Sequence, residues 1–201
     1  MQVVGQQPVD SFAEKWLTAK KFLRAEKIDS LLPLVVAMRK VSEKEQVEQQ
    51  AKINYLLAEY WHYQGVWQKG IEHSDLSIIN FSKDTLHPLL LAEAHLLKGS
   101  CLHELDEWDQ ALTSYKQSLF LKQKTLGQHH LKVSNLHFNI GYILQEKRDL
   151  LASDSAFFRG INVLRAIYRE ENEEFADFYE ELGFNQSFKG DFKGAADYLQ
   201  K

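Results

Sequence analysis

The sequence has little of what a disulfide-bonded or sheet-rich protein needs. Of its 201 residues, one is cysteine, three are proline and ten are glycine. A single cysteine, Cys101, cannot form a disulfide within the chain, which favours a reducing compartment such as the cytoplasm. So few prolines and glycines leave little material for the turns that a sheet-rich fold needs about every 8 to 12 residues. We therefore expect an all-α, cytoplasmic protein.

Features of exported, membrane-spanning and nucleic-acid-binding proteins are also missing. The N-terminal segment lacks the basic start, apolar run and small-residue cleavage site of a secretory signal. The longest apolar run, residues 31–38, is far shorter than the roughly 20 residues that cross a bilayer. A net charge of -4 gives no overall attraction to a phosphate backbone. We therefore expect no membrane segment and no direct contact with nucleic acid.

What the sequence does have is a repeat, visible as four columns of residues in register. Small residues stand 41, 42 and 42 positions apart at Ala58, Gly99, Gly141 and Gly183. The other columns follow them by 9, 12 and 16 positions: Trp67, Trp108, Leu150 and Phe192; Gly70, Ala111, Ser153 and Ala195; Ser74, Tyr115, Phe157 and Leu199. Small residues on facing helices allow close backbone approach, and aromatic residues fill the gaps. The columns predict antiparallel helix pairs stacked in sequence order.

These residues resemble the tetratricopeptide repeat (TPR). Gly99, Ala111 and Tyr115 match the glycine, alanine and aromatic positions of its signature, and Gly183 and Ala195 repeat the first step. The 42-residue length and the segment 119–133 are similar to the extended repeats of kinesin light chains. The resemblance implies an all-α, right-handed superhelical solenoid that binds other proteins and is not an enzyme.

The chain is expected to divide near residue 43. Residues 1–43 would form an N-terminal helical pair, either a degenerate repeat or a cap, and residues 44–201 a repeat domain with repeats starting near residues 51, 92, 134 and 176. The last repeat is incomplete, so we expect the native C-terminus to lie beyond residue 201. Its final helix would present an apolar face that could support a homodimer, formed by Ala195, Ala196, Tyr198 and Leu199.

The resemblance also implies a binding surface, because TPR proteins turn one side of each first helix toward a concave face. The candidate partner-binding residues are Tyr55, Glu59, His62 and Tyr63 in the first repeat, Ser100, His103 and Glu104 in the second, Asn135, Phe138, Asn139, Tyr142 and Glu146 in the third, and Glu181 and Phe184 in the fourth. Carboxylates interleaved with aromatic rings suit a protein or peptide with basic and apolar side chains. We predict an interaction scaffold that binds such a segment.

Two alternatives remain open. The chain could be the regulatory input domain of a larger bacterial signalling or transcription-regulating protein, and the helical segment 11–41 could itself occupy the concave face. Histidines share repeat positions, His62 with His103 and His95 with His137, but neighbouring helices lie about 10 Å apart and packing explains them more simply. The sequence contains no phosphate-binding loop, nucleophile elbow or HExxH motif. We therefore expect no catalytic residue, metal site or cofactor.

Overall fold

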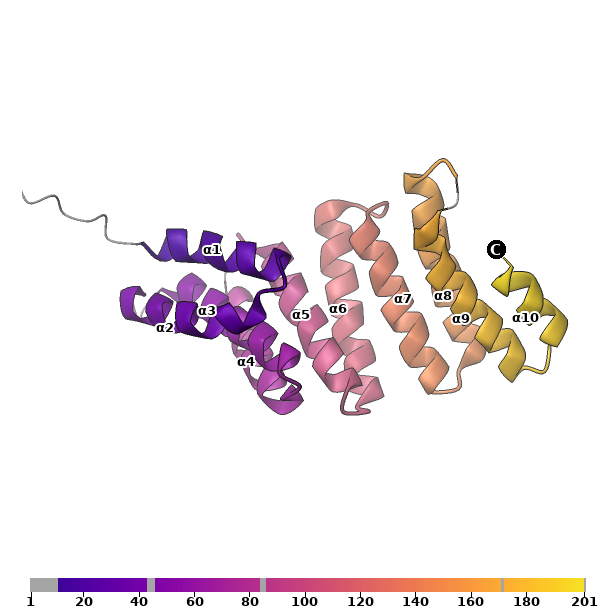
Figure 1. Cartoon of the computed structure of the whole chain (residues 1–201), viewed down its shortest axis with the longest axis horizontal. Coiled ribbons are helices and arrows are strands. Elements are labelled where there is room, and N and C mark those ends of the chain that lie inside the picture. Colours follow the sequence, from indigo (N-terminus) through magenta and orange to yellow (C-terminus); the bar gives the residue numbers. More distant parts are fainter. Residues whose placement is uncertain (1–10, 43–45, 84–85, 171, 201) are drawn as a thin grey trace, which may run out of the picture. The chain divides into compact units, whose positions relative to one another are not determined.

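A computed structural model describes residues 11–42, 46–83, 86–170 and 172–200, and all regular elements within these ranges are helices (Figure 1). The chain forms two compact units, residues 1–87 (unit 1) and 88–201 (unit 2). The expected division near residue 43 falls in residues 43–45, which lie outside the described ranges. The first predicted repeat belongs to unit 1, because its helices pack with the N-terminal helices.

Unit 1 contains two successive helix pairs. Its elements are α1 (Phe12–Arg24), the 3₁₀ helix η1 (Ile28–Ser30), α2 (Leu31–Val41), α3 (Val47–Tyr63) and α4 (Trp67–Phe81). Ser11 begins α1 with a capping box, in which its hydroxyl accepts from the Glu14 amide and the Glu14 carboxylate accepts from the Ser11 amide. The core of the unit forms where α2 packs against α3 and α3 against α4.

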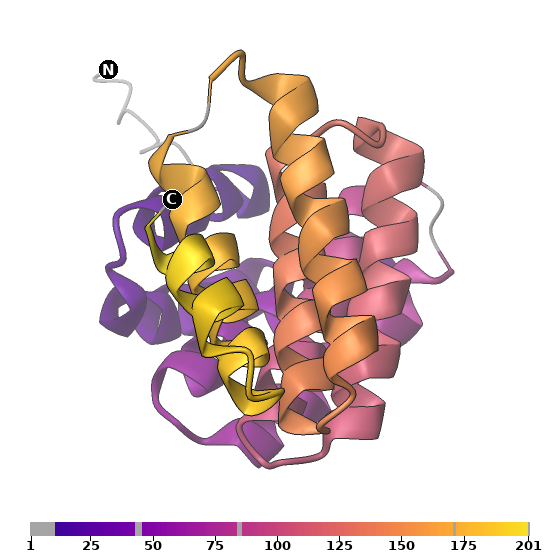
Figure 2. The same ribbon diagram turned by 90° about the vertical axis from the view of Figure 1, so that its right-hand side faces the viewer.

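Unit 2 contains three antiparallel pairs that follow one another along the chain (Figures 1 and 2). Its helices are α5 (Pro88–His103), α6 (Trp108–Leu126), α7 (Leu131–Glu146), α8 (Leu150–Ile167), α9 (Glu173–Phe188) and α10 (Phe192–Leu199). The first helices of the pairs begin three or four residues before the predicted starts of their repeats. At α5 this is because Pro88 can occupy the first helical position, where no amide partner is needed. The predicted all-helical, paired architecture is confirmed.

The column of small residues at Gly99 and Gly141 and the column at Tyr115 and Phe157 contact each other across the two helices of a pair. A Cβ atom on Gly99 would lie 2.7 Å from the Tyr115 ring, and one on Gly141 would lie 2.5 Å from the Phe157 ring. Both distances are too short for a carbon contact, so these rings occupy the space that glycine leaves. In the α3–α4 pair of unit 1 the same column holds Ala58, and its partner column holds the small Ser74.

A second tie between paired helices was not predicted. The Ser77 hydroxyl donates to the Ala51 carbonyl over 3.0 Å, and the Ser118 hydroxyl to the Ala92 carbonyl over 2.7 Å. In the α7–α8 pair the direction is reversed, because Ser134 of the first helix donates to the Gly160 carbonyl of the second over 3.0 Å. These three buried bonds hold the α3–α4, α5–α6 and α7–α8 pairs together at the end opposite the connecting turn.

The turn inside each pair also repeats. Residues in the left-handed region stand at Gly65, Asp106, Arg148 and Gly190, with φ of 69°, 58°, 62° and 82°. In each turn the following amide donates to a carbonyl five residues back, which satisfies the helix end. Glu26, after α1, has φ of 54° and the same hydrogen bond between Lys27 and Phe22. The turn after α1 therefore has the same backbone geometry as the turns within the later pairs.

The apolar face expected on the last helix is partly used inside unit 2. Ala195 is buried, and its carbonyl lies close to Gly183 of α9. The Tyr198 ring stacks on Tyr179 with a centroid distance of 6.3 Å. Only Ala196 and Leu199 of the four predicted residues stay exposed. The predicted dimer surface is therefore wrong in half of its members, because they pack against α9.

Two glycine substitutions in one column should separate packing from helix propensity. We expect Gly141→Ala to lower the free energy of unfolding, because a clash in a packed core costs about 1–3 kcal/mol and outweighs the roughly 0.5–1 kcal/mol gained by removing a helical glycine. Gly183→Ala should change stability by less than about 0.5 kcal/mol, because its nearest neighbour is the exposed Leu199 side chain, which can move. Urea unfolding of both variants measures the difference, and equal effects would contradict this packing account.

Candidate functional site

A groove on unit 2 contains two neighbouring cavities on either side of α7. The first, here named the aromatic cavity, has a volume of about 200 Å³ and is lined by His103, Tyr115, Phe138, Asn139 and Tyr142. The second, named the acidic cavity, has a volume of about 270 Å³ and is lined by Asn135, Phe138, Asn139, Glu174, Asp177 and Phe178. Phe138 and Asn139 line both, so the two cavities are neighbours on unit 2.

Aromatic packing holds the walls of the aromatic cavity in place. The Phe138 ring lies 5.6 Å from the Phe157 ring and 5.2 Å, edge-on, from the Phe178 ring. The His103 ring meets Tyr142 edge-on at 5.4 Å. Edge-to-face pairs of this kind add about 0.5–1.5 kcal/mol beyond the burial of area. Phe138 therefore belongs both to the core and to the surface of the site, and its position does not depend on a ligand.

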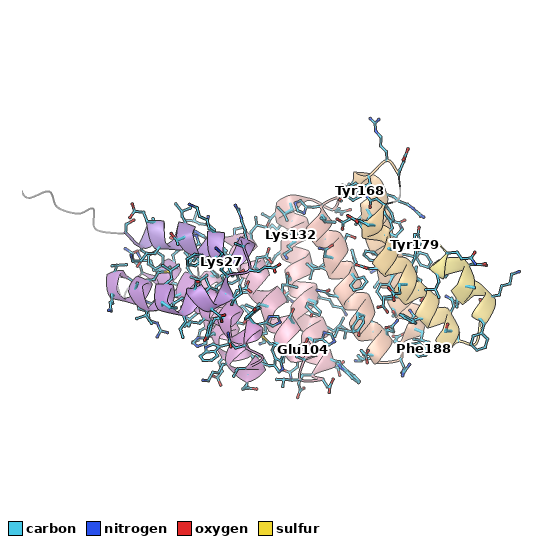
Figure 3. The ribbon with its side chains drawn as sticks, viewed as in Figure 1. Lys27, Glu104, Lys132, Tyr168, Tyr179 and Phe188 are labelled. Atoms are coloured by element: carbon cyan, nitrogen blue, oxygen red, sulfur yellow. The ribbon has the colours of Figure 1, made fainter. Side chains whose placement is uncertain are left out.

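Three carboxylates, from α7, from α9 and from the turn after α5, act electrostatically on the Tyr142 hydroxyl. Burial raises the pKa of the Tyr142 hydroxyl, and the charges of Glu146, Glu181 and Glu104 raise it further. Figure 3 shows Glu104 and Phe188 near the lower ends of the helices of unit 2, and Lys132 near their upper ends. The Tyr142 hydroxyl thus stays protonated in a region of negative potential. Such a region attracts cations.

The pKa of Glu181 is also affected by the neighbouring acids. Burial raises the pKa of the Glu181 carboxyl, and the neighbouring Glu180, Asp177 and Glu146 add to the rise, while a hydrogen bond from Gln145 opposes it. Each neighbouring acid disfavours the charged form. The described residues that line the two cavities include no lysine or arginine to offset these charges.

Glu93, on α5, shows the opposite arrangement. Its carboxylate accepts from the Lys122 ammonium over 2.9 Å and from the Lys132 ammonium over 2.6 Å. Burial raises the pKa of Glu93, but the two lysines outweigh this effect and hold it below its ordinary value of 4.5. Lys122 is only 2% exposed, so this ion pair is structural. Lysine side chains therefore offset the charge of Glu93, whereas the described residues that line the two cavities offer no such cation to the acids near Tyr142.

A buried amide network fixes the helix that carries Glu181. The Gln145 amide donates to the Asn185 carbonyl oxygen over 3.0 Å, and the Asn185 amide donates to Ser153 and Asp154 over 2.9 and 2.7 Å. Asn185 is fully buried, and these bonds connect α7, α8 and α9. The network defines the register of α9 against α7, and with it the positions of the acids on α9.

The structure brings together eight of the predicted partner-binding residues of unit 2. His103, Phe138, Asn139 and Tyr142 line the aromatic cavity, Asn135 and Asn139 line the acidic cavity, and Glu104, Glu146 and Glu181 lie around Tyr142. Ser100 accepts a hydrogen bond from the Tyr115 hydroxyl over 3.4 Å at the edge of this site. Phe184 is exposed on α9 but lines neither cavity.

The predicted residues of unit 1 are placed differently. Tyr55 is only 8% exposed, because Trp16 of α1 packs edge-on against it at 6.4 Å, so its prediction as an open partner contact is wrong. Its hydroxyl donates to Glu59, and the His62 ring packs against Trp67 at 5.3 Å. Tyr63 is exposed. Trp16 precedes Tyr55 by 39 residues, as His103 precedes Tyr142, so α1 packs here as an ordinary preceding helix of the series.

Four of the lining residues, Tyr115, Glu174, Asp177 and Phe178, are not among the candidate residues named from the sequence. Tyr115 was assigned to helix packing only, although its ring both fills the space at Gly99 and lines the aromatic cavity. Glu174 and Phe178 come from α9, next to the acidic cavity. Asp177 occupies the repeat position of Asn135, 42 residues later, and this equivalence was the available signal for the acidic cavity.

His137 serves packing inside a helix interface. Burial lowers the pKa of His137 to about 4, assisted by the charge of Arg159, so this ring is neutral within its helix interface. Within the described part of the chain, no three His, Cys, Asp or Glu side chains are grouped as a metal site. None of the described helices is both long and apolar enough to cross a membrane.

Solved structures with the same architecture give the fold. BtubC (BKLC) from P. vanneervenii superimposes with a TM-score of 0.78 at 15% identity, over 94% of this chain and 76% of that one. The apo form of RapI gives 0.79 at 13% identity, over 94% and 68%. A P. anserina protein with nearly identical TPR-like repeats gives 0.73 at 14% identity, over 94% and 92%. The fold is TPR-like. No family model and no curated protein sequence matches the chain.

Two glutamate-to-glutamine variants should have opposite effects on stability near pH 7. Glu93→Gln should lower the free energy of unfolding by about 2 kcal/mol, because it leaves the buried Lys122 without its counter-charge. Glu181→Gln should raise it by less than about 1 kcal/mol, because it removes repulsion at a partly exposed site. Urea unfolding of the two variants and the wild type measures both changes.

The pH dependence of these effects provides the control. The pKa of Glu93 is depressed in the folded state, so its contribution is present above pH 4.5 and lost as the pH falls through the lower, folded value. The pKa of Glu181 is raised, so its unfavourable contribution is present near neutral pH and disappears below pH 4.5. A Glu181→Gln variant that is less stable than the wild type near pH 7 would contradict this electrostatic account.

Proposed function

We propose that the chain is a protein-interaction scaffold whose unit 2 groove binds an extended protein segment with basic and apolar side chains. The observation that carries this proposal is a cavity lined by aromatic rings beside a cavity lined by Glu174 and Asp177, with further carboxylates acting electrostatically on Tyr142. Charges kept in this way cost stability, and such a cost is typical of binding sites. A basic partner would offset them by ion pairs and cation–π contacts.

The size of the cavities favours a protein segment over a small molecule. Pockets for drug-sized ligands measure about 300–1,000 Å³, whereas the aromatic and acidic cavities measure about 200 and 270 Å³. Each is therefore suited to single side chains of a longer ligand that crosses α5, α7 and α9. Phe184 and Phe188 are exposed on α9 and supply apolar surface along this path.

The finer parts of the prediction remain predictions. These are a cytoplasmic location, the absence of catalytic activity, the role as a regulatory input domain, and homodimerisation through the last helix. For the last of these, two of the four predicted residues already pack against α9, so we place the main partner surface in the groove instead.

Affinity capture with matched variants tests the proposal. The groove variant combines Tyr142→Ala with Glu146→Lys, and the control variant combines Phe120→Ala with Glu72→Lys, which also removes one ring and reverses one charge. Phe120 and Glu72 are exposed and line neither cavity. We expect the groove variant to retain partners at least about tenfold less well than the wild type, because central interface residues contribute 2 kcal/mol or more.

The control variant should retain the same partners as the wild type. Circular dichroism and urea unfolding of both variants establish that they are folded. Partners retained by the groove variant but lost by the control would place the interface elsewhere and refute the proposal.

A further inference from the structure

The aromatic cavity is lined almost entirely by ring-bearing side chains from three successive helices. His103 comes from α5, Tyr115 from α6, and Phe138 and Tyr142 from α7, and Asn139 of α7 adds an amide. Tyr115 is buried and the other four residues are half-buried. The described residues that line the cavity include no Asp, Glu, Lys or Arg. An occupant therefore meets ring surface and one amide group, and no partner for an ion pair.

Packing outside the cavity holds two of these rings in place. The Tyr115 ring fills the space beside Gly99, where a Cβ atom would lie only 2.7 Å from it. The Phe138 ring packs against the Phe157 ring and, edge-on, against the Phe178 ring. These walls are therefore formed before a ligand arrives. A preformed site loses little affinity to rearrangement on binding.

The size of the aromatic cavity matches a single aromatic ring. An apolar cavity of about 150 Å³ is large enough to bind benzene, and the aromatic cavity has a volume of about 200 Å³. A side chain as small as alanine would leave most of this space empty and would lose the contacts that a larger group makes with the walls. The ring of one aromatic residue fills it.

The chemistry of the lining also favours an aromatic occupant. Aromatic rings attract one another in edge-to-face and offset arrangements, so a ring gains more from these walls than an aliphatic group of the same size. A cation that leaves water needs a counter-charge. Glu174 and Asp177 line the acidic cavity and supply such a charge there, whereas the described lining of the aromatic cavity does not. The two cavities therefore suit different side chains of one ligand.

We propose that the aromatic cavity binds one aromatic side chain of the partner protein, and that a basic side chain of the same segment enters the neighbouring acidic cavity. This inference rests on the proposed function, because it specifies how the same groove recognises its ligand. It adds an aromatic anchor and assigns each kind of side chain to one cavity.

Selection of displayed random twelve-residue peptides on the full chain, followed by binding measurements with synthetic copies, tests the inference. We expect the selected peptides to share an aromatic residue. Replacing that residue by alanine should weaken binding at least about tenfold, because the burial of a ring is lost. Replacing it by cyclohexylalanine, which is apolar and similar in size but not aromatic, should weaken binding about two- to tenfold.

Variants of the protein test the two cavities separately. Tyr142→Ala removes a wall of the aromatic cavity and should weaken binding at least about tenfold, whereas Tyr142→Phe keeps the ring and should bind within about threefold of the wild type. The double variant Glu174→Gln with Asp177→Asn should remove the preference for a basic residue and keep the preference for an aromatic one. The control Phe120→Ala should bind like the wild type. Circular dichroism and urea unfolding establish that each variant is folded.

The other outcomes separate this inference from the proposed function. Peptides that need Tyr142 but share no aromatic residue, or that bind equally well with cyclohexylalanine, would overturn the inference and leave the groove as the binding surface. Equal losses with Tyr142→Phe and Tyr142→Ala would also overturn it, because the hydroxyl and not the ring would then be recognised. Peptides that bind all variants equally, or no selected peptides at all, would contradict both the inference and the proposed function.

Discussion

The close approach of the two helices of each pair is the contact on which the rest of unit 2 depends. Where Gly99 or Gly141 lacks a side chain, the ring of Tyr115 or Phe157 from the second helix fills the space. Tyr115 also lines the aromatic cavity, and Phe157 packs against Phe138, which lines both cavities. The packing that closes each pair therefore also builds the floor of the groove.

The distribution of charge then separates structural from binding acids. Glu93 and Asp154 are buried or half-buried, and both have lysine partners, so their charges support the fold. Glu104, just after α5, and Glu146, the last residue of α7, occupy the same position in successive repeats. Their charges and that of Glu181 add up around Tyr142 without an opposing cation among the described residues that line the cavities. Repetition of the fold thus gives successive repeats an acid at the same position.

Much of the fold could be predicted from the sequence, because residue size at a fixed period reports how closely backbones approach. The columns at Gly99, Gly141, Tyr115 and Phe157 correspond to real contacts. The serine ties could not be predicted in the same way. Their donor changes from the second helix in Ser77 and Ser118 to the first helix in Ser134, so neither column shows one residue type throughout.

Four of the candidate residues on α7 line the two cavities. Asn135, Phe138, Asn139 and Tyr142 all line the groove. Tyr55 was predicted wrongly, because a repeat position does not show that Trp16 of the preceding helix covers it. Glu174 was missed for a physical reason, since acids in the first turn of a helix are already explained by the helix dipole. Sequence position alone does not distinguish a dipole-stabilising acid from a ligand-binding acid.

Photocross-linking from the centre of the groove tests the central claim most directly. Asn139, which lines both cavities, is replaced by the photoreactive residue p-benzoylphenylalanine, and Phe120, which lines neither, is replaced in a second preparation. On irradiation in the source cell, the account predicts cross-links from position 139 to a protein segment with basic and apolar side chains, and none to that segment from position 120. Cross-links to partners from position 120 alone would contradict the account.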